Sequence, residues 1–453
     1  MQEQQILRLL HLNTDAKTGE GRPLKILMVD KYYFIKGGAE RYYFELSGIL
    51  TSKSHEIIPF SMQHPDNFRP EYENYFVENI EFNGISGLRK LSKTPEILAR
   101  VIYSTSAKKA ISKLIEKVKP DIAHIHMIDH QLSPSILHAF RDHNIPVMQT
   151  CHQYKLICPS YRLFVMHKNQ VCEKCISGKN YHAVFEKCHK NSVAASAVVA
   201  AESYIHRWMK IYDLIDVFHV PSKFLRQKLI EGGFPEEKIW HNFYTINLND
   251  YPFHLKSGDY CIYYGRLSEE KGVLTLLNAM CRLPEAKLLI AGDGPQRTEL
   301  ENFAREKQLN RVQFVGNKNK KEITRLVQNA KFVVVPSEWH DNSPLVIYES
   351  FSMGKPVIVS EMGGMPELVD HEINGLHFKA GDVDGLSASI QRLWHDIELC
   401  KKMGIKAREK ADREFSPEAH YENIIKIYNT LLGSKQRVQG KIRINELIKT
   451  AVG

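Results

Sequence analysis

The sequence lacks the features of a membrane-spanning or secreted chain. A helix that crosses a bilayer needs about 20 consecutive apolar residues, and the longest candidate here, residues 193–201, is about half that length. Residues 1–22 are polar and contain no apolar segment of the kind found in secretory signals. No internal repeat and no low-complexity tract is present. We therefore expect a cytoplasmic protein.

Basic residues interleaved with aromatic ones, as in RNA-binding modules, are also absent. This absence argues against a nucleic-acid binder, although the chain carries a formal net charge of +9. A positive excess equally suits phosphorylated ligands or an anionic membrane surface, and charge alone does not choose between them.

Part of the basic excess is local and lies in residues 89–119. Apolar residues recur there at helical spacing, among them Ile111, Leu114, Ile115 and Val118. Two interpretations stay open. The segment is either a basic amphipathic surface in peripheral contact with an anionic membrane, or a pair of surface helices packed on a sheet with solvated lysines.

What is present is an alternation of short β-branched runs with helical patterns, which predicts parallel sheets covered by helices on both faces. At 453 residues the chain is long enough for two or three domains. A loop-like stretch at 247–258 predicts a domain boundary, and hence two doubly wound α/β domains facing across a cleft. The predicted strands are 25–29, 56–60, 121–126, 146–150 and 217–220 before this boundary, and 260–264, 287–291, 312–315, 331–335 and 356–359 after it.

The most informative stretch is 332–358, which predicts a buried strand, a polar loop and a short helix. We expect Ser343 to be the N-cap, with Pro344 at the first helical position. Asp341 lies just before this helix and Glu349 lies inside it, about 7 to 8 Å along the axis from Pro344. Free N–H groups at the helix start attract phosphate between the two acids. A ligand with hydroxyls at both ends and phosphates in the middle is a nucleotide-sugar.

A second signal is the segment 263–272, which follows a predicted strand. Its Gly265 allows the backbone to approach a ligand closely. Arg266 can donate two hydrogen bonds to one phosphate, while Lys271 places a point charge on the other.

The spacing of Asp341 and Glu349 resembles the acid-x7-acid signature of family 4 retaining glycosyltransferases, and the Arg266 and Lys271 segment matches the pyrophosphate grip of the same family. The resemblance implies the GT-B fold. It also implies that Asp341 holds the donor sugar and Glu349 the ribose. The family normally has Glu at the first acid, and Asp is shorter by one C–C bond of about 1.5 Å.

The same resemblance implies further site residues. His152, at the end of a predicted strand, would touch the reacting sugar, with His124 and His126 as weaker candidates and structural roles as the alternative. The turn at 291–295 would shape the cleft floor. The catalytic residues would be His152, Arg266, Lys271 and Asp341, and donor-binding residues would be Gly37, Gly38, Gly265, Arg266, Lys271, Gly316, Asn317, Asp341, Ser343, Leu345, Val346, Glu349 and Gly364.

The sequence Asp382-Val383-Asp384 spells the Asp-x-Asp of metal-dependent glycosyltransferases. It precedes a helical pattern, so an N-cap is the better interpretation. We expect no catalytic metal and no catalytic cofactor.

Four of the eight cysteines lie within residues 158–188. A Cys-x-x-Cys pair with two further thiols can close a structural zinc site, and a redox pair or free thiols are the alternatives. Disulfides are disfavoured in a reducing cytoplasm. Some members of the resembled family carry a similar cysteine-rich insert. The four candidate ligands are Cys158, Cys172, Cys175 and Cys188.

The resemblance predicts a retaining glycosyltransferase that moves a sugar from a nucleotide-diphosphate sugar to a glycan or lipid-linked acceptor, in exopolysaccharide, capsule or lipopolysaccharide synthesis. A catalytically reduced sugar-binding or regulatory protein of the same fold is the alternative. The predicted parts are a polar extension (1–22), an acceptor-side domain (23–248) with the insert (158–188), a nucleotide-sugar domain (249–415) and helices that cross back to the first domain (416–453).

Overall fold

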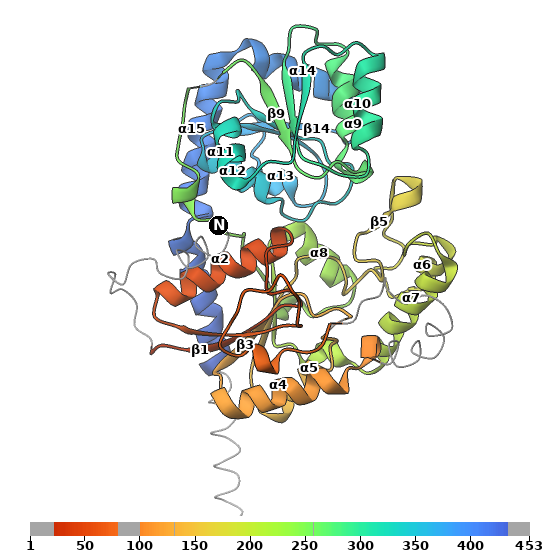
Figure 1. Cartoon of the computed structure of the whole chain (residues 1–453), viewed down its shortest axis with the longest axis vertical. Helices are drawn as coiled ribbons and strands as arrows, with labels where there is room; N and C mark the ends of the chain where they lie inside the picture. Colours follow the sequence, from red (N-terminus) through yellow and green to blue (C-terminus); the bar gives the residue numbers. More distant parts are fainter. Residues whose placement is uncertain (1–21, 80–99, 131, 257, 434–453) are drawn as a thin grey trace, which may run out of the picture.

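The structure is a computed structural model that describes residues 22–79, 100–130, 132–256 and 258–433. Two separate six-stranded sheets form its two lobes (Figure 1). Every strand pairing within both sheets is parallel. Such sheets are buried on both faces, and β1, β3, β4, β9, β10, β12 and β13 are almost entirely buried. The predicted α/β class with two doubly wound domains is therefore confirmed.

The first sheet has the order β2-β1-β3-β4-β7-β8. Its order reverses between β1 and β3, and the carboxyl ends of these neighbours flank a crevice. The strands are β1 (Lys25–Val29), β2 (Glu56–Phe60), β3 (Ile122–Ile125), β4 (Val147–Thr150), β7 (Val217–Val220) and β8 (Ile239–His241).

The second sheet has the order β11-β10-β9-β12-β13-β14, which reverses between β9 and β12. The predicted division after residue 248 falls between the two sets of strands. The strands are β9 (Cys261–Tyr264), β10 (Leu288–Ala291), β11 (Val312–Gly316), β12 (Val333–Val335), β13 (Val357–Ser360) and β14 (Gly375–Phe378).

All ten predicted strands are present, with ends that differ by no more than two residues. The sequence did not predict β8 and β14, which form one edge of each sheet, or the two-residue hairpin strands β5 (Phe164–Val165) and β6 (Gln170–Val171).

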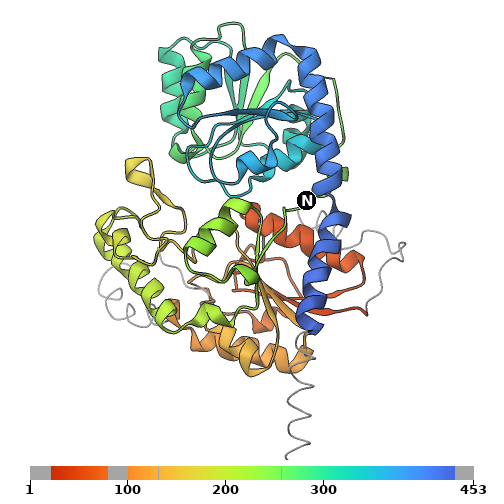
Figure 2. The same cartoon turned by 180° about the vertical axis from the view of Figure 1, so that it is seen from behind.

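Helices cover both faces of each sheet (Figures 1 and 2). In the first lobe they are α2 (Gly38–Ser52), α4 (Thr105–Val118), α5 (Ile136–Asp142), α6 (His182–Phe185), α7 (Val193–Trp208) and α8 (Lys223–Glu231). In the second they are α9 (Val273–Met280), α10 (Arg297–Glu306), α11 (Lys320–Gln328), α12 (Leu345–Ser352), α13 (Met365–Leu368), α14 (Val383–His395) and α15 (Ile397–Glu414).

Residues 417–433 are helical and lie against the first lobe (Figure 2). The imidazole of His420 and the hydroxyl of Tyr42 are hydrogen-bonded at 2.9 Å, and Tyr428 and His124 are joined in the same way at 2.6 Å. The chain therefore returns from the second lobe to the first.

In α4 the apolar side of the predicted amphipathic pattern is buried in the core of the first lobe. Its apolar residues are thus not free to enter a lipid surface, while Lys109, Lys113 and Lys117 are exposed. The preceding part of the basic segment, 89–99, lies outside the described residues. None of the helices in the described ranges combines the length and apolar character needed to span a membrane.

Candidate active site

Several predicted site residues lie at the switch points of the two sheets. Gly265 and Arg266 follow β9, and the loop that carries Asp341 follows β12, its neighbour across the switch point. Ligands of open α/β sheets bind in this position. Across the gap, Gly38 begins α2 of the first lobe, and a Cβ on it would lie 3.7 Å from Leu345 Cδ1 of α12.

Lys271 and Asp341 form an ion pair, with 2.5 Å between Lys271 Nζ and Asp341 Oδ2. The Ser337 hydroxyl donates to the same carboxylate oxygen at 3.3 Å. The Lys271 ammonium group also lies 5.2 Å from the centre of the Trp339 ring, and the face of this ring attracts the positive charge. The two predicted catalytic residues therefore lie together, each neutralising the other.

Arg266 is exposed, and within the described residues its guanidinium has no ion-pair or hydrogen-bond partner. Two residues before Arg266, the Tyr264 hydroxyl donates to the Val346 carbonyl in the first turn of α12 at 3.0 Å. This helix begins without a side-chain cap, so N–H groups of its first turn stay available. An unpaired guanidinium beside an uncapped helix start is an anion-binding arrangement.

The prediction that Ser343 caps α12 is wrong. The N-cap is Pro344, and the Ser343 hydroxyl is instead hydrogen-bonded to the Tyr348 hydroxyl at 2.6 Å. Because Tyr348 is fully buried and its hydroxyl needs a partner, it engages the serine that the helix start would otherwise use.

Glu349 is buried and contacts the first lobe directly. Arg41 Nη1 of α2 lies 2.7 Å from Glu349 Oε1, and the Tyr251 hydroxyl donates to the same oxygen at 3.3 Å. Arg41 Nη2 also donates to the Tyr251 hydroxyl at 2.8 Å. The predicted ribose-binding acid is thus part of a three-residue contact between the lobes and the linker.

Gly363 and Gly364 lie against the loop that carries Asp341. A Cβ on Gly363 would fall 2.3 Å from the Asp341 carbonyl oxygen, and a Cβ on Gly364 2.0 Å from that of Asn342. The two glycines therefore allow the close approach of this loop. A contact between Gly364 and the donor stays a prediction.

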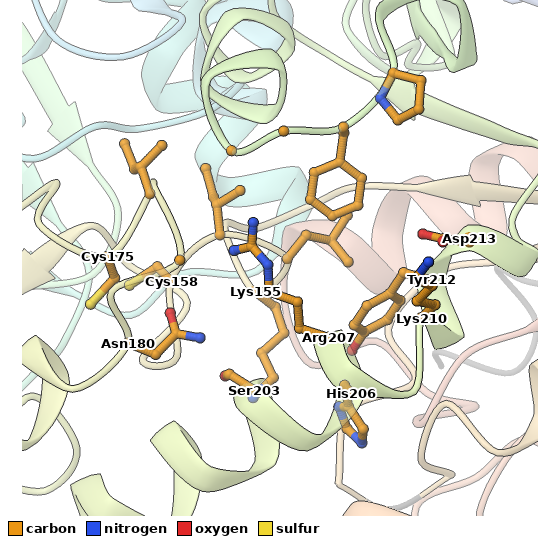
Figure 3. Close-up of a pocket in the computed structure, with 18 residues that line it drawn as sticks. Lys155, Cys158, Cys175, Asn180, Ser203, His206, Arg207, Lys210, Tyr212 and Asp213 are labelled. Atoms are coloured by element: carbon orange, nitrogen blue, oxygen red, sulfur yellow. The ribbon is translucent and has the colours of Figure 1, made fainter.

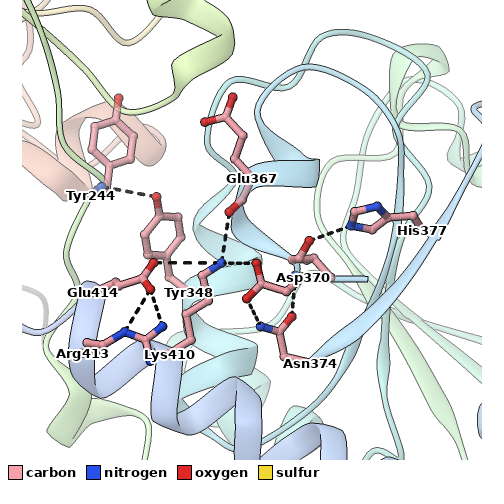
Figure 4. Close-up of polar contacts among 10 residues, drawn as sticks. Tyr244, Tyr348, Glu367, Asp370, Asn374, His377, Lys410, Arg413 and Glu414 are labelled. Atoms are coloured by element: carbon pink, nitrogen blue, oxygen red, sulfur yellow. Dashed lines mark hydrogen bonds and ion pairs between the residues drawn. The ribbon is translucent and has the colours of Figure 1, made fainter. Parts of the chain in front are cut away.

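Glu367 follows these glycines and reaches the first lobe. Its carboxylate accepts the N–H groups of Lys223 and Phe224, both at 2.6 Å, at the start of α8. Lys410 of α15 binds the same segment by donating hydrogen bonds to the Glu367 carbonyl and to the Asp370 carboxylate (Figure 4). Burial raises the pKa of Glu367.

The remaining glycines shape the floor of the cleft. A Cβ on Gly292 would lie 1.8 Å from the Gly265 carbonyl oxygen, so the turn at 291–295 packs directly under the Arg266 loop. Gly316 ends β11 with φ +71°, where glycine is favoured, and Asn317 is exposed beside it. The predicted contacts of Gly316 and Asn317 with the base stay predictions.

His152 has both ring nitrogens engaged by the protein. Nδ1 and the Tyr244 hydroxyl lie 2.6 Å apart, and Nε2 lies 2.9 Å from His126 Nδ1. The His126 and His152 rings stack at 5.2 Å between centres. Burial, with His219 nearby, lowers the pKa of His152 to about 3, so its imidazole is neutral.

The sequence did not predict several contacts that join the lobes beside this histidine. The Asn342 amide donates to the Cys151 carbonyl at 3.3 Å, and the Ser222 hydroxyl donates to the Asn342 side-chain oxygen at 2.6 Å. The Tyr154 hydroxyl donates to the His340 carbonyl at 2.8 Å. The only sequence signal for these residues is their place beside the strand ends that carry His152 and Asp341.

The four cysteines of the insert lie near one another. Burial and the neighbouring thiols raise the pKa of Cys175 and of Cys188, each to about 12. Among the described residues, no group of three or more His, Cys, Asp or Glu side chains is placed to hold a metal ion. The four thiols therefore lie close together, but in this geometry they are not placed to coordinate one metal ion.

The prediction that residues 382–384 form an N-cap is confirmed. Asp382 is the N-cap of α14, and its carboxylate accepts the Gly385 N–H at 3.0 Å.

Two parts of the chain match family models of glycosyltransferases. Residues 36–243 match the family model described as Glycosyltransferase Family 4, and residues 253–410 match the one described as Glycosyl transferases group 1. The uncharacterised glycosyltransferase MJ1607 of Methanocaldococcus jannaschii is 24% identical over 424 residues, covering 89% of this chain and 98% of that protein.

Other relatives match over a smaller share. The lipopolysaccharide core biosynthesis glycosyltransferase LpsE of Rhizobium meliloti is 33% identical over 172 residues, which cover 38% of this chain and 48% of that protein. A crystal structure of Anabaena HepE in complex with UDP and glucose has a TM-score of 0.59 at 16% identity, covering 90% of this chain and 99% of that one. This likeness shows the fold alone, and the fold is GT-B.

Proposed function

We propose that this GT-B protein, whose two halves match glycosyltransferase family models, is a retaining glycosyltransferase that uses a nucleotide-diphosphate sugar. The observation that carries the proposal is the unpaired Arg266 guanidinium beside the uncapped start of α12, at the switch point of the second sheet. A diphosphate is the group that such a pair of donors recognises. HepE, with the same fold, was solved with UDP and glucose.

In this proposal Arg266 and Lys271 stabilise the charge that builds on the departing diphosphate. Glu349 accepts from the ribose hydroxyls, and Asp341 contacts the donor sugar. His152 is neutral, which suits a hydrogen-bonding role toward the sugar rather than a charged one. The leaving phosphate takes the proton of the acceptor hydroxyl, which attacks from the same face, so the anomeric configuration is retained without a divalent metal.

We propose a glycan or lipid-linked acceptor, and a role in exopolysaccharide, capsule or lipopolysaccharide synthesis. The name of the relative LpsE, a lipopolysaccharide core biosynthesis glycosyltransferase, supports this assignment. The exposed lysines of α4 support peripheral contact with an anionic membrane at its cytoplasmic face.

The test is the response of Arg266→Ala. Thermal-shift titration with UDP and GDP should raise the unfolding midpoint of the unchanged protein, since ligands stabilise the state that they bind. Arg266→Ala should lower turnover by about two orders of magnitude, the scale of removing one preorganised donor. The matched control is Arg305→Ala, on the exposed side of α10 away from the cleft. Near-normal turnover of Arg266→Ala would refute the assignment.

A catalytically reduced member of the fold is the second candidate. It is favoured by Asp341, which is short and already paired with Lys271. Incubation with candidate donors separates the two, because an enzyme transfers or slowly hydrolyses the sugar and a binding protein leaves it intact.

We propose that Cys158, Cys172, Cys175 and Cys188 hold a structural zinc ion. The Cys-x-x-Cys spacing of Cys172 and Cys175, with two further thiols in the same insert, supports this set, and zinc would bind the deprotonated thiolates. Elemental analysis should find about one equivalent of zinc. Cys175→Ser should remove it, whereas Cys281→Ser, at an exposed cysteine outside the insert, should not.

A further inference from the structure

A separate cavity of about 130 Å³ lies in the first lobe, away from the diphosphate site. Its walls come from the loop after β4, the turn after Cys175, the last turns of α7 and the loop after α8 (Figure 3). An apolar cavity of about 150 Å³ accommodates one benzene molecule, so this volume holds a bare six-membered ring, and the substituents of a sugar would extend into the mouth.

The inner end of the cavity carries polar side chains. Asn180 is only 6% exposed, and within the described residues its amide has no hydrogen-bond partner. Lys155 is 8% exposed, and its Nζ donates to Glu202 at 2.8 Å. Both side chains line the cavity and are drawn there in Figure 3. The Asn180 amide is open to the cavity and can hydrogen-bond to a ligand there.

The mouth of the cavity carries two cations and one acid, Asp213. Arg207 and Lys210 are exposed, and neither has an ion-pair partner among the described residues. A Cβ on Gly178 would lie 2.0 Å from Arg207 Nη1, and one on Gly233 3.9 Å from Arg207 Nη2. These glycines leave room for the Arg207 guanidinium beside the cavity.

The remaining walls are polar at Cys158, Cys175, Ser203 and His206, and elsewhere they are apolar or aromatic. The apolar parts offer a surface for the C–H groups of a ring, while the amide and cations meet its hydroxyls and a negative charge. The apolar and aromatic lining residues are Leu156, Ile157, Ile176, Tyr212, Phe234 and Pro235.

The cavity adjoins the predicted reaction face. A second cavity of about 20 Å³, lined by His152, shares Lys155, Leu156 and Tyr212 with it. In this small cavity His126 Nε2 and Gln149 Oε1 are buried without a hydrogen-bond partner. Its volume suits one water molecule or hydroxyl group.

We propose that the larger cavity binds a sugar ring carrying a carboxylate or phosphate, with the ring inside and the anionic group between Arg207 and Lys210. We assign this anionic sugar to the acceptor, and this assignment rests on the proposed function. The existence of the binding site does not depend on the proposed function.

The test is isothermal titration calorimetry of the full chain with glucuronate, glucose 1-phosphate, glucose and inorganic phosphate, in the presence of saturating UDP. At least one anionic sugar should bind about tenfold or more tightly than glucose or phosphate, because only it uses both ends of the cavity. Arg207→Gln should lower this affinity about tenfold while the unfolding midpoint stays unchanged. The matched control is Arg305→Gln, since both arginines are exposed in the last turn of a helix.

Equal affinity of Arg207→Gln and the unchanged protein would overturn the proposal, as would equal binding of phosphate and the sugars or no binding at all. Binding that appears only without UDP would place the ligand in the diphosphate site and overturn it too. A protein that binds the anionic sugar but no nucleotide would keep this site and reject the proposed function.

Discussion

At the scale of single residues, the Lys271 and Asp341 pair gives opposite expectations for its two members. Asp341 neutralises the cation and would repel an incoming diphosphate. Asp341→Asn should therefore leave the affinity for UDP or GDP equal or higher, up to about tenfold, while sugar transfer falls at least about tenfold. Calorimetry of the diphosphates and initial rates with the donor measure the two effects separately.

Lys271→Met is the counterpart. It leaves the carboxylate of Asp341 unpaired beside the phosphates, so diphosphate affinity should fall about tenfold or more. If both substitutions weaken diphosphate binding alike, the pair does not act on the phosphates in the way that its geometry indicates.

The sequence predicted which residue types meet at the site, because strand ends and helix starts are local features. It did not predict their partners. Ser343 looked like a cap because Pro344 follows it, but the buried Tyr348 hydroxyl engages it. Arg41 gave no signal as the partner of Glu349, since the two meet only when the lobes pack together.

At the scale of elements, the central strands were predictable because they are continuous β-branched or apolar runs, as in Val333–Val335. Of the four edge strands, β2 and β11 were predicted, whereas β8 and β14 were not. β8 contains Trp240 and His241 and is only partly buried, and β14 begins with Gly375. Neither of these two strands has the continuous β-branched or apolar run that identifies strands in a sequence.

The packing of α2 against α12 leads to a second prediction. Arg41→Ala would leave the Glu349 carboxylate buried without its cation, and losing one member of a buried pair costs about 3–5 kcal/mol. Because the Arg41 side chain is 29% exposed, solvent reduces this loss, and we expect about 1–3 kcal/mol in urea denaturation. The donor KM should rise as well.

The control is Arg392→Ala, which removes a surface ion pair with Glu372 whose partners are 44% and 50% exposed. Its cost should stay below about 1 kcal/mol. Equal losses for the two variants would show that the Arg41 contact behaves as an ordinary surface pair.

At the scale of the whole molecule, a buried network of histidines and hydroxyls joins the first sheet to the returning helix. Thr150 Oγ1 links His124 Nε2 at 2.7 Å to His219 Nδ1 at 2.9 Å, and Asn242 bonds both His219 and His420. Burial, the largest cause, lowers the pKa of His219 to about 4 and of His420 to about 3.

This network predicts that acid destabilises the folded chain. Unfolded histidines have a pKa of about 6.5, so between that value and the folded pKa the unfolded state binds protons that the folded state does not. The stabilisation is fully present above pH 6.5, and each such histidine lowers the free energy of unfolding by about 1.4 kcal/mol per pH unit as the pH falls below it. Urea denaturation from pH 7 to pH 5 should show this slope.

His420→Gln, which removes one titrating group, should make this pH dependence of the unfolding free energy shallower by one proton. Buried carboxyls also titrate over this range, but they are common to both proteins, so the difference in slope isolates the histidine. An identical slope in both would mean that His420 takes up protons as readily in the folded chain as in the unfolded one.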